Sequence, residues 1–150
     1  MKRSPFQLFC SAQPARLTIA RMGQLCCMGA VVKCSFGAAP SSLVVLPLGR
    51  PLAPLPAATI MDNKPFANIL PFGMCNSMAN PMVAAATAAA LGVLTPMPCI
   101  PATATPWIPG GAPTVLLGNM PALDANSTLM CNWAGVIKIA MPGQMQMLIP

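Results

Sequence analysis

The sequence predicts a small, mainly β domain with one short helix and many rigid loops. Short runs of Val, Ile and Leu alternate with turn-forming Gly, Ser, Pro and Asn, which is the pattern of short strands. Proline accounts for 19 of the 150 residues and excludes long helices from most of the chain. A single alanine-rich run has the composition of a helix.

The expected strands lie at residues 31–32, 43–46, 67–70, 114–117 and 135–140. Each contains Val, Ile or Leu and is bounded by turn residues. The first two are separated by Ser35-Phe36-Gly37 and Pro40-Ser41-Ser42, so we expect them to pair like a hairpin. The proline-rich residues 48–56 and 95–113 are expected to form extended loops without regular structure.

The expected helix covers residues 81–92. Asn80 is a favoured N-cap, and Pro81 is favoured at the first helical position. The alanines that follow have the highest helix propensity of any residue. Gly92 and Pro96 then provide the signal that ends the helix.

Basic residues are concentrated at the start of the chain. The sequence has 8 Lys+Arg and 2 Asp+Glu, and most of the basic residues precede residue 34. The remainder is nearly neutral and lacks the basic stripe with interleaved aromatics that a nucleic-acid-binding domain carries. We therefore expect no nucleic-acid partner. Residues 1–22 are expected to be a basic extension, disordered or untranslated, before one domain at residues 23–150.

Residues suited to catalysis are scarce. The chain has no His, which excludes Ser-His and Cys-His pairs, and its only carboxylates are those of Asp62 and Asp124. No glycine-rich phosphate-binding motif is present. These absences predict a protein that is not an enzyme. The longest apolar run, residues 82–94, is also shorter than the roughly 20 residues that a membrane-spanning helix needs.

A faint repeat relates two segments of the chain. Residues 56–63 begin with Pro-Ala and include Asp62, and residues 121–126 begin with Pro-Ala and include Asp124. A cysteine follows each copy. Repeated strand-and-turn units of this kind suit a pseudo-symmetric β architecture.

Four cysteines are spread through the body of the chain, each beside turn residues: Cys34, Cys75, Cys99 and Cys131. Four thiolates that converge from four turns would form a tetrahedral site for zinc, with iron as the alternative metal. No Cys-x-x-Cys pair supports a metal site by spacing. Buried thiols without a metal and two disulfides therefore remain open alternatives. The roles of Cys10, Cys26 and Cys27 are not indicated by the sequence.

Six motifs follow one another along the chain: Val32–Gly37, Pro56–Thr59, Asp62–Pro65, Pro71–Cys75, Pro96–Pro101 and Leu129–Gly135. Together they resemble the PAAR-like proteins that form the tips of contractile injection machines such as type VI secretion systems. The resemblance covers about residues 23–143. Thr59 replaces the arginine of the motif that gives the family its name.

The resemblance implies a small conical β structure that caps a trimeric β-helical spike, sharpens it for membrane puncture and could carry effector or adaptor proteins. It implies a metal near the apex, which the family binds through His and Cys. Because this chain has no His, the matching ligands would be Cys34, Cys75, Cys99 and Cys131. Contact with the target membrane would be transient. The protein would be assembled in the bacterial cytoplasm and then secreted or delivered into a target cell.

The strands expected to meet the spike supply six apolar candidates: Val44, Val45, Val115, Leu116, Val136 and Ile137. Ordinary core packing is the alternative role for each of them. The alternative for the whole chain is a small secreted or membrane-associated structural protein that is held by disulfides and binds no metal.

Overall fold

The computed structural model describes residues 23–47, 55–111 and 114–149. The strands are β1 (Gly23–Gln24), β2 (Val31–Cys34), β3 (Ser41–Ser42), β4 (Met74–Cys75), β5 (Met97–Pro98), β6 (Leu116–Leu117), β7 (Met120–Pro121), β8 (Thr128–Met130), β9 (Val136–Met141) and β10 (Leu148–Ile149). The helix is α1 (Pro81–Ala89). This part of the chain is therefore mainly β, as the sequence predicts. The expected extension at residues 1–22 lies outside the described residues.

The largest sheet has four antiparallel strands in the order β3-β2-β9-β8. Its central strands, β2 and β9, pair Val32 with Ile139 and Cys34 with Ile137. Along β9 the fully buried Ile137 is followed by the exposed Lys138, so one face of the sheet points into the core and the other toward solvent. The core therefore lies on one side of this sheet.

The main core is filled by large side chains from loops as well as strands. Phe72 and Trp107 are both about 1% exposed, and they pack in one cluster with Val32 and Ile137. The indole Nε1 of Trp107 donates a hydrogen bond to the Asp62 carbonyl oxygen at 2.9 Å. The proline-rich loops are thus fixed by buried aromatic anchors and not only by stiff backbone.

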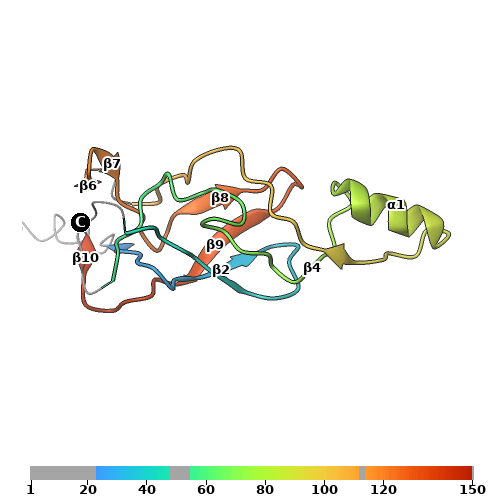
Figure 1. Ribbon diagram of the computed structural model, residues 1–150, viewed down its shortest axis with the longest axis horizontal. Helices are drawn as coiled ribbons and strands as arrows, with labels where there is room; N and C mark the ends of the chain where they lie inside the picture. Colours follow the sequence, from blue (N-terminus) through green and yellow to red (C-terminus); the bar gives the residue numbers. More distant parts are fainter. Residues whose placement is uncertain (1–22, 48–54, 112–113, 150) are drawn as a thin grey trace, which may run out of the picture.

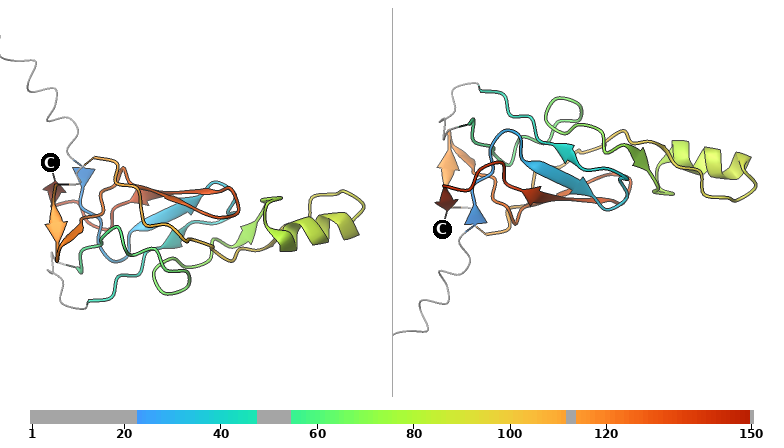
Figure 2. Two further views of the ribbon diagram at one scale, coloured as in Figure 1. Left: turned by 90° about the horizontal axis from the view of Figure 1, so that it is seen from above. Right: turned by 90° about the horizontal axis from the view of Figure 1, so that it is seen from below.

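The molecule is elongated and has two different ends (Figure 1). The β1–β10 and β6–β7 ribbons lie together at one end, which we call the blunt end (Figure 2). At the opposite end, the β4–β5 ribbon carries α1 away from the body. We call residues 74–98, which comprise β4, α1, β5 and their connections, the apical hairpin.

Three short segments close into a ring of backbone hydrogen bonds next to the blunt end. Cys26 donates its N–H to the carbonyl oxygen of Leu123 at 2.8 Å, Leu123 donates to Ala58 at 2.9 Å, and Ala58 donates to Cys26 at 2.8 Å. All three residues are fully buried. We call residues 25–27, 57–59 and 122–124 the three-segment ring. Each segment thus donates to one neighbour and accepts from the other.

The bridges around this ring repeat the same cyclic order. They join Cys27 to Ala57, Thr59 to Ala122, and Asp124 to Leu25. The middle residues of the three segments are Cys26, Ala58 and Leu123. Each bridge joins the residue after one middle residue to the residue before the next, which is the pattern of a pseudo-three-fold axis. Two of the three segments belong to the copies of the faint sequence repeat. The repeat therefore marks two of three equivalent positions, and residues 25–27 supply the third.

Several expected strands differ in the structure. Residues 31–34 and 136–141 are strands close to the expected positions, and β6 occupies the end of the expected 114–117 segment. Residues 43–46 are not a strand, since β2 pairs instead with β3 just before them and Leu43 forms only an isolated bridge. Residues 95–113 contain β5, which pairs with β4 despite the proline density.

The segment 67–70 is a turn and not a strand, and the side chain of Asn68 explains why. Its Oδ1 accepts from the N–H of Lys64 at 3.3 Å, and its Nδ2 donates to the Val44 carbonyl oxygen at 2.8 Å. Asn68 N–H also donates to the Lys64 carbonyl oxygen at 2.9 Å. These local bonds satisfy the backbone in a tight turn and compete with strand pairing.

The helix begins where the sequence predicts and ends three residues earlier. Asn80 caps α1 by accepting from the N–H of Met82 at 3.1 Å, with Pro81 in the first turn. After Ala89 the chain turns through Leu91 and Gly92, which have φ values of 58° and 90°. Left-handed residues at this position are a common way to end a helix.

Candidate metal centre

The four candidate cysteines all lie where the sheet meets the apical hairpin. Cys34 ends β2, Cys75 ends β4, Cys99 follows β5, and Cys131 follows β8. An isolated bridge from Gly37 to Cys75 ties the hairpin to the turn after β2. The topology therefore brings together four turns that are far apart in the sequence.

The four thiols are free and mostly buried. Cys75, Cys99 and Cys131 are 2%, 4% and 6% exposed, and Cys34 is half-buried. Main-chain bonds fix two of their positions, since Cys99 N–H donates to Gly73 O at 2.7 Å and Cys131 N–H donates to Gly135 O at 2.8 Å. The backbone around the sulfurs is thus held in place by the fold itself.

The thiols are close enough to influence one another electrostatically. The pKa of Cys99 is raised to about 11, chiefly by burial. A backbone hydrogen bond from Phe72 opposes the increase, and Coulombic interactions with Cys75, Cys34 and Cys131 add to it. Burial likewise raises the pKa of Cys34, where backbone hydrogen bonds from Phe36 and Gly37 favour the thiolate and interactions with Cys131 and Cys75 oppose it. Each sulfur is therefore in the electrostatic field of the others.

Gly135 provides the space that the sulfurs occupy. A Cβ at Gly135 would lie 2.9 Å from Cys34 Sγ and 3.5 Å from Cys131 Cβ. A side chain there would push the Cys34 sulfur out of its place. Sequence analysis assigned no role to Gly135, although it lies in the same motif as Cys131.

Four cysteine thiols match the ligand preference of zinc. To bind one zinc ion, their sulfur atoms would have to come closer together. Four thiolates are a complete ligand set for a structural zinc, and backbone N–H groups aimed at sulfur stabilise the thiolate form that ligates. Within the described residues, no three His, Cys, Asp or Glu side chains are already placed to share one ion.

Two further cysteines lie away from this centre. Cys26 and Cys27 are fully buried in the three-segment ring near the blunt end. Burial raises the pKa of both thiols, and for Cys26 the charges of Asp124 and Cys27 add to the increase. They pack as small apolar residues in this structure. Cys10 lies outside the described residues.

The six residues expected to meet a spike differ in exposure. Val45 and Ile137 are buried in the core, so they are core residues and not part of a docking surface, which corrects that expectation. Three others are half-buried: Val44, Val115 and Val136. Val136 also lies beside Cys34, far from the blunt end, because its carbonyl oxygen accepts from Ser35. Leu116 is 57% exposed on the β6–β7 ribbon.

The blunt end carries five exposed apolar side chains, of which the sequence analysis selected only Leu116. They come from β6, β7, β10 and the segment before β10: Leu116, Met120, Met145, Met147 and Leu148. We call these five residues the blunt face. A two-residue turn at Gly118 and Asn119, both with positive φ, forms the β6–β7 ribbon and is the sequence signal that could have revealed it.

A buried glutamine positions part of the blunt face. Gln144 Nε2 donates to the carbonyl oxygens of Leu25 at 2.6 Å and Met147 at 2.9 Å. Its Oε1 accepts from the N–H groups of Gln146 and Met147, each at 2.7 Å. One polar side chain thus fixes the loop that presents Met145, and its four bonds satisfy its own buried polar atoms.

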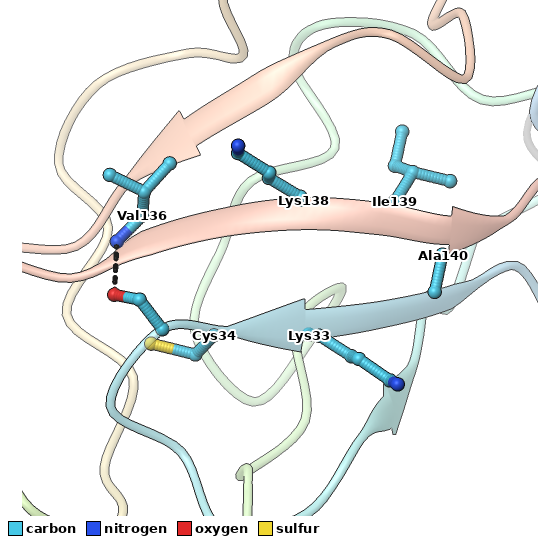
Figure 3. Close-up of a pocket in the computed structure, with 7 residues that line it drawn as sticks. Lys33, Cys34, Val136, Lys138, Ile139 and Ala140 are labelled. Carbon is cyan, nitrogen blue, oxygen red and sulfur yellow. Dashed lines mark hydrogen bonds between the residues drawn. The ribbon is translucent and has the colours of Figure 1, made fainter.

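An open pocket of about 470 Å³ lies over β2 and β9 (Figure 3). Its charged side chains are Lys33 and Lys138, which are register partners whose ammonium groups point apart. Ser35 Oγ accepts from the N–H of Val136 at 3.0 Å at the end of the pocket next to Cys34. No acidic side chain lines this pocket. It therefore offers no pair of acid and base.

A family model matches residues 26–144 and describes a domain of unknown function, DUF4280. The chain belongs to the DUF4280 family. The matched DUF4280 region includes the four clustered cysteines and the whole apical hairpin. It also includes the three-segment ring, apart from Leu25. The chain matches no curated protein and no solved structure. Within the described residues, no helix is long and apolar enough to cross a membrane.

Proposed function

We propose that this DUF4280 protein is the structural, non-enzymatic tip of a contractile injection machine and that it caps a trimeric β-helical spike. The observation that carries the proposal is the pseudo-three-fold arrangement of residues 25–27, 57–59 and 122–124. A single chain that caps three identical chains has to offer three similar surfaces around one axis. The three-segment ring provides such an axis beside the blunt face.

The distribution of apolar side chains supports the same orientation. The five residues of the blunt face are between 42% and 77% exposed. Exposed apolar patches usually mark interaction sites, so the blunt end is the surface that would cover the end of the spike. The opposite end is narrow and carries the apical hairpin (Figures 1 and 2). The hairpin would therefore lead during injection.

Zinc is proposed as the structural metal, with iron as the alternative, and Cys34, Cys75, Cys99 and Cys131 would hold it. The ion would supply cross-links between four turns at the base of the apical hairpin. Force on the leading end would otherwise separate these turns, since short two-stranded ribbons have little stability of their own. Partner effectors or adaptors could travel with the tip. As a tip, the protein would be assembled onto the spike in the bacterial cytoplasm and then secreted or delivered into a target cell.

The test is capture of the tip by the trimeric spike protein of the same organism. We expect a complex of one tip and three spike chains, measured by light scattering after size-exclusion chromatography. Leu116→Asp combined with Leu148→Asp places two charges on the blunt face and is expected to weaken capture at least tenfold. The matched control is Phe66→Asp, since Phe66 is 56% exposed on a turn outside the blunt face.

Two results would contradict the proposal. One is a wild-type chain that does not bind the spike at micromolar concentration. The other is a complex with three tips on each spike trimer, because the pseudo-three-fold axis would then have no use. Equal loss of capture in the control variant would show that the blunt face is not the contact surface.

A further inference from the structure

We infer that the apical hairpin inserts directly into the hydrocarbon layer of a lipid bilayer. The inference rests on the proposed function in naming the partner of the leading end. It is carried by three features of residues 74–98, which are the absence of charge, the exposure of apolar side chains at the far end, and the internal pairing of backbone amides in the turn after α1.

The hairpin lies within a long part of the chain that has no charged residue. Residues 65–123 contain no Asp, Glu, Lys, Arg or His. Protein interfaces usually have a polar rim around an apolar centre, and helices that lie on membrane surfaces usually carry Lys or Arg on one face. The hairpin has no Lys or Arg, and its few exposed polar side chains, such as Asn76, are uncharged. This composition is typical of a segment that enters hydrocarbon and not of one that binds lipid headgroups.

Apolar side chains are most exposed in the turn after α1, which lies at the far end of the molecule (Figure 1). Leu91 is 95% exposed, Val93 is 68% exposed and Leu94 is 49% exposed. Met78 and Met82 add apolar surface near the start of α1. No other part of the described structure covers these side chains.

Leu91 is also held in an unfavourable backbone conformation. Its φ is 58°, in the left-handed region where Gly or Asn is preferred and a leucine is strained. Because the side chain is almost fully exposed, packing within the fold does not compensate for this strain. Insertion into hydrocarbon would bury the Leu91 side chain, which the fold itself leaves exposed.

Most backbone amides in the turn after α1 are paired internally, and pairing of this kind lowers the cost of entering hydrocarbon. In the turn, the N–H groups of Leu91, Gly92 and Val93 donate to carbonyl oxygens of residues 87–90 at 2.9–3.2 Å. Thr95 donates its N–H to the buried Thr87 Oγ1 at 3.2 Å and its hydroxyl to the Val93 carbonyl oxygen at 3.0 Å. The turn therefore exposes apolar side chains while the N–H groups of residues 91–93 and 95 are already satisfied.

The size of the helix fits one leaflet of a bilayer. At 1.5 Å per residue, Pro81–Ala89 is about 13.5 Å long. Half of the hydrocarbon core of a typical bilayer is about 15 Å thick. The helix could thus enter one leaflet with the cysteine cluster left near the headgroups. It is too short to span both leaflets.

The test measures partition of the full chain onto neutral phosphatidylcholine vesicles by flotation. We expect binding that is unchanged between low and high salt, because the hairpin has no charge. Leu91→Asn combined with Val93→Asp is expected to lower the partition coefficient at least tenfold. Asn suits the backbone at position 91, so this variant is expected to keep its fold, as judged by circular dichroism and Tm. Phe66→Asp is the control and is expected to bind like the wild type.

Insertion depth is a second readout. A tryptophan introduced by Val93→Trp is expected to be quenched by lipids brominated on their acyl chains. No binding to neutral vesicles would overturn the inference, as would binding that needs anionic lipid and disappears at high salt. Equal losses in the hairpin variant and in Phe66→Asp would overturn it too. Spike capture by the hairpin variant separates the two proposals, because it tests the blunt face alone.

Discussion

At the scale of single residues, the surroundings of each thiol at the base of the apical hairpin affect whether that thiol is protonated. Burial and mutual repulsion keep the pKa of Cys99 near 11, so this thiol is protonated at neutral pH in the metal-free protein. The backbone groups that face Cys34 and Cys99 act in the opposite direction and favour the thiolate. Without a cation nearby, burial thus favours the neutral thiol form of Cys34 and Cys99.

Zinc binding is accordingly expected to release protons and to strengthen as pH rises. Zinc has to displace the proton of each raised-pKa thiol, and this competition decreases as pH increases toward about 11 for Cys99. Titration with a competing chelator between pH 6.5 and pH 8.5 measures the slope. We expect one zinc per chain and four protected thiols, and Cys75→Ser is expected to lower affinity at least tenfold.

Gly135 offers a test that leaves every sulfur in place. Gly135→Ala would bring a Cβ to 2.9 Å from Cys34 Sγ, so we expect zinc affinity to fall in the same titration. The neighbouring Ala134→Gly is the control, because Ala134 has a φ of 60° and glycine accepts that conformation more readily. Unchanged zinc affinity in Gly135→Ala would mean that the ion is bound elsewhere or not at all.

At the scale of secondary-structure elements, α1 depends on its N-cap. Asn80→Ala removes the acceptor for the N–H of Met82 and is expected to destabilise the hairpin by about 1 kcal/mol. Asn80→Ser keeps an acceptor and removes the buried Nδ2, which has no partner within the described chain, so it is expected to be neutral or stabilising. Hydrogen exchange of the α1 amides measures both effects. Equal protection in the two variants would contradict the capping role.

The elements that the sequence predicted are those with strong local signals. Asn80 and Pro81 specify the start of α1, and the β-branched runs specify β2 and β9. The segment 67–70 was mistaken for a strand because the bonds of the Asn68 side chain are not visible in hydrophobic periodicity. Strands of two residues, such as β1 and β10, have no period to detect. Their positions follow only from distant parts of the chain.

The role of the four cysteines as metal ligands stays a prediction, and the sequence did not indicate how they are arranged. Turn residues and the family resemblance selected the four cysteines, and the fold places them together at one end of the sheet. The sequence indicated only Leu116 of the blunt face, because the methionines there resemble ordinary core residues until burial is known. For the same reason, Val45 and Ile137 were selected as surface residues although both are buried.

At the scale of the whole molecule, the three-segment ring is expected to govern stability. Ala58→Pro removes the N–H that bonds to Cys26 and leaves a buried carbonyl without its partner. We expect a loss of more than about 2 kcal/mol in the free energy of unfolding. Ala58→Gly keeps the N–H and removes one buried methyl group, so a smaller loss of about 1 kcal/mol is expected. Urea unfolding compares them, and similar losses would show that the bond contributes little.

The three segments of the ring are synthesised at different times, so the ring forms late in translation. The ring joins residues near positions 26, 58 and 123, so it cannot close until most of the chain has left the ribosome. A product that terminates before Leu123 lacks one of the three partners and leaves buried amides of the other two unsatisfied. We expect such fragments to be cleared by proteases before assembly. Under the proposed function, closure of the ring would ensure that only chains that extend past Leu123 are incorporated into the injection machine.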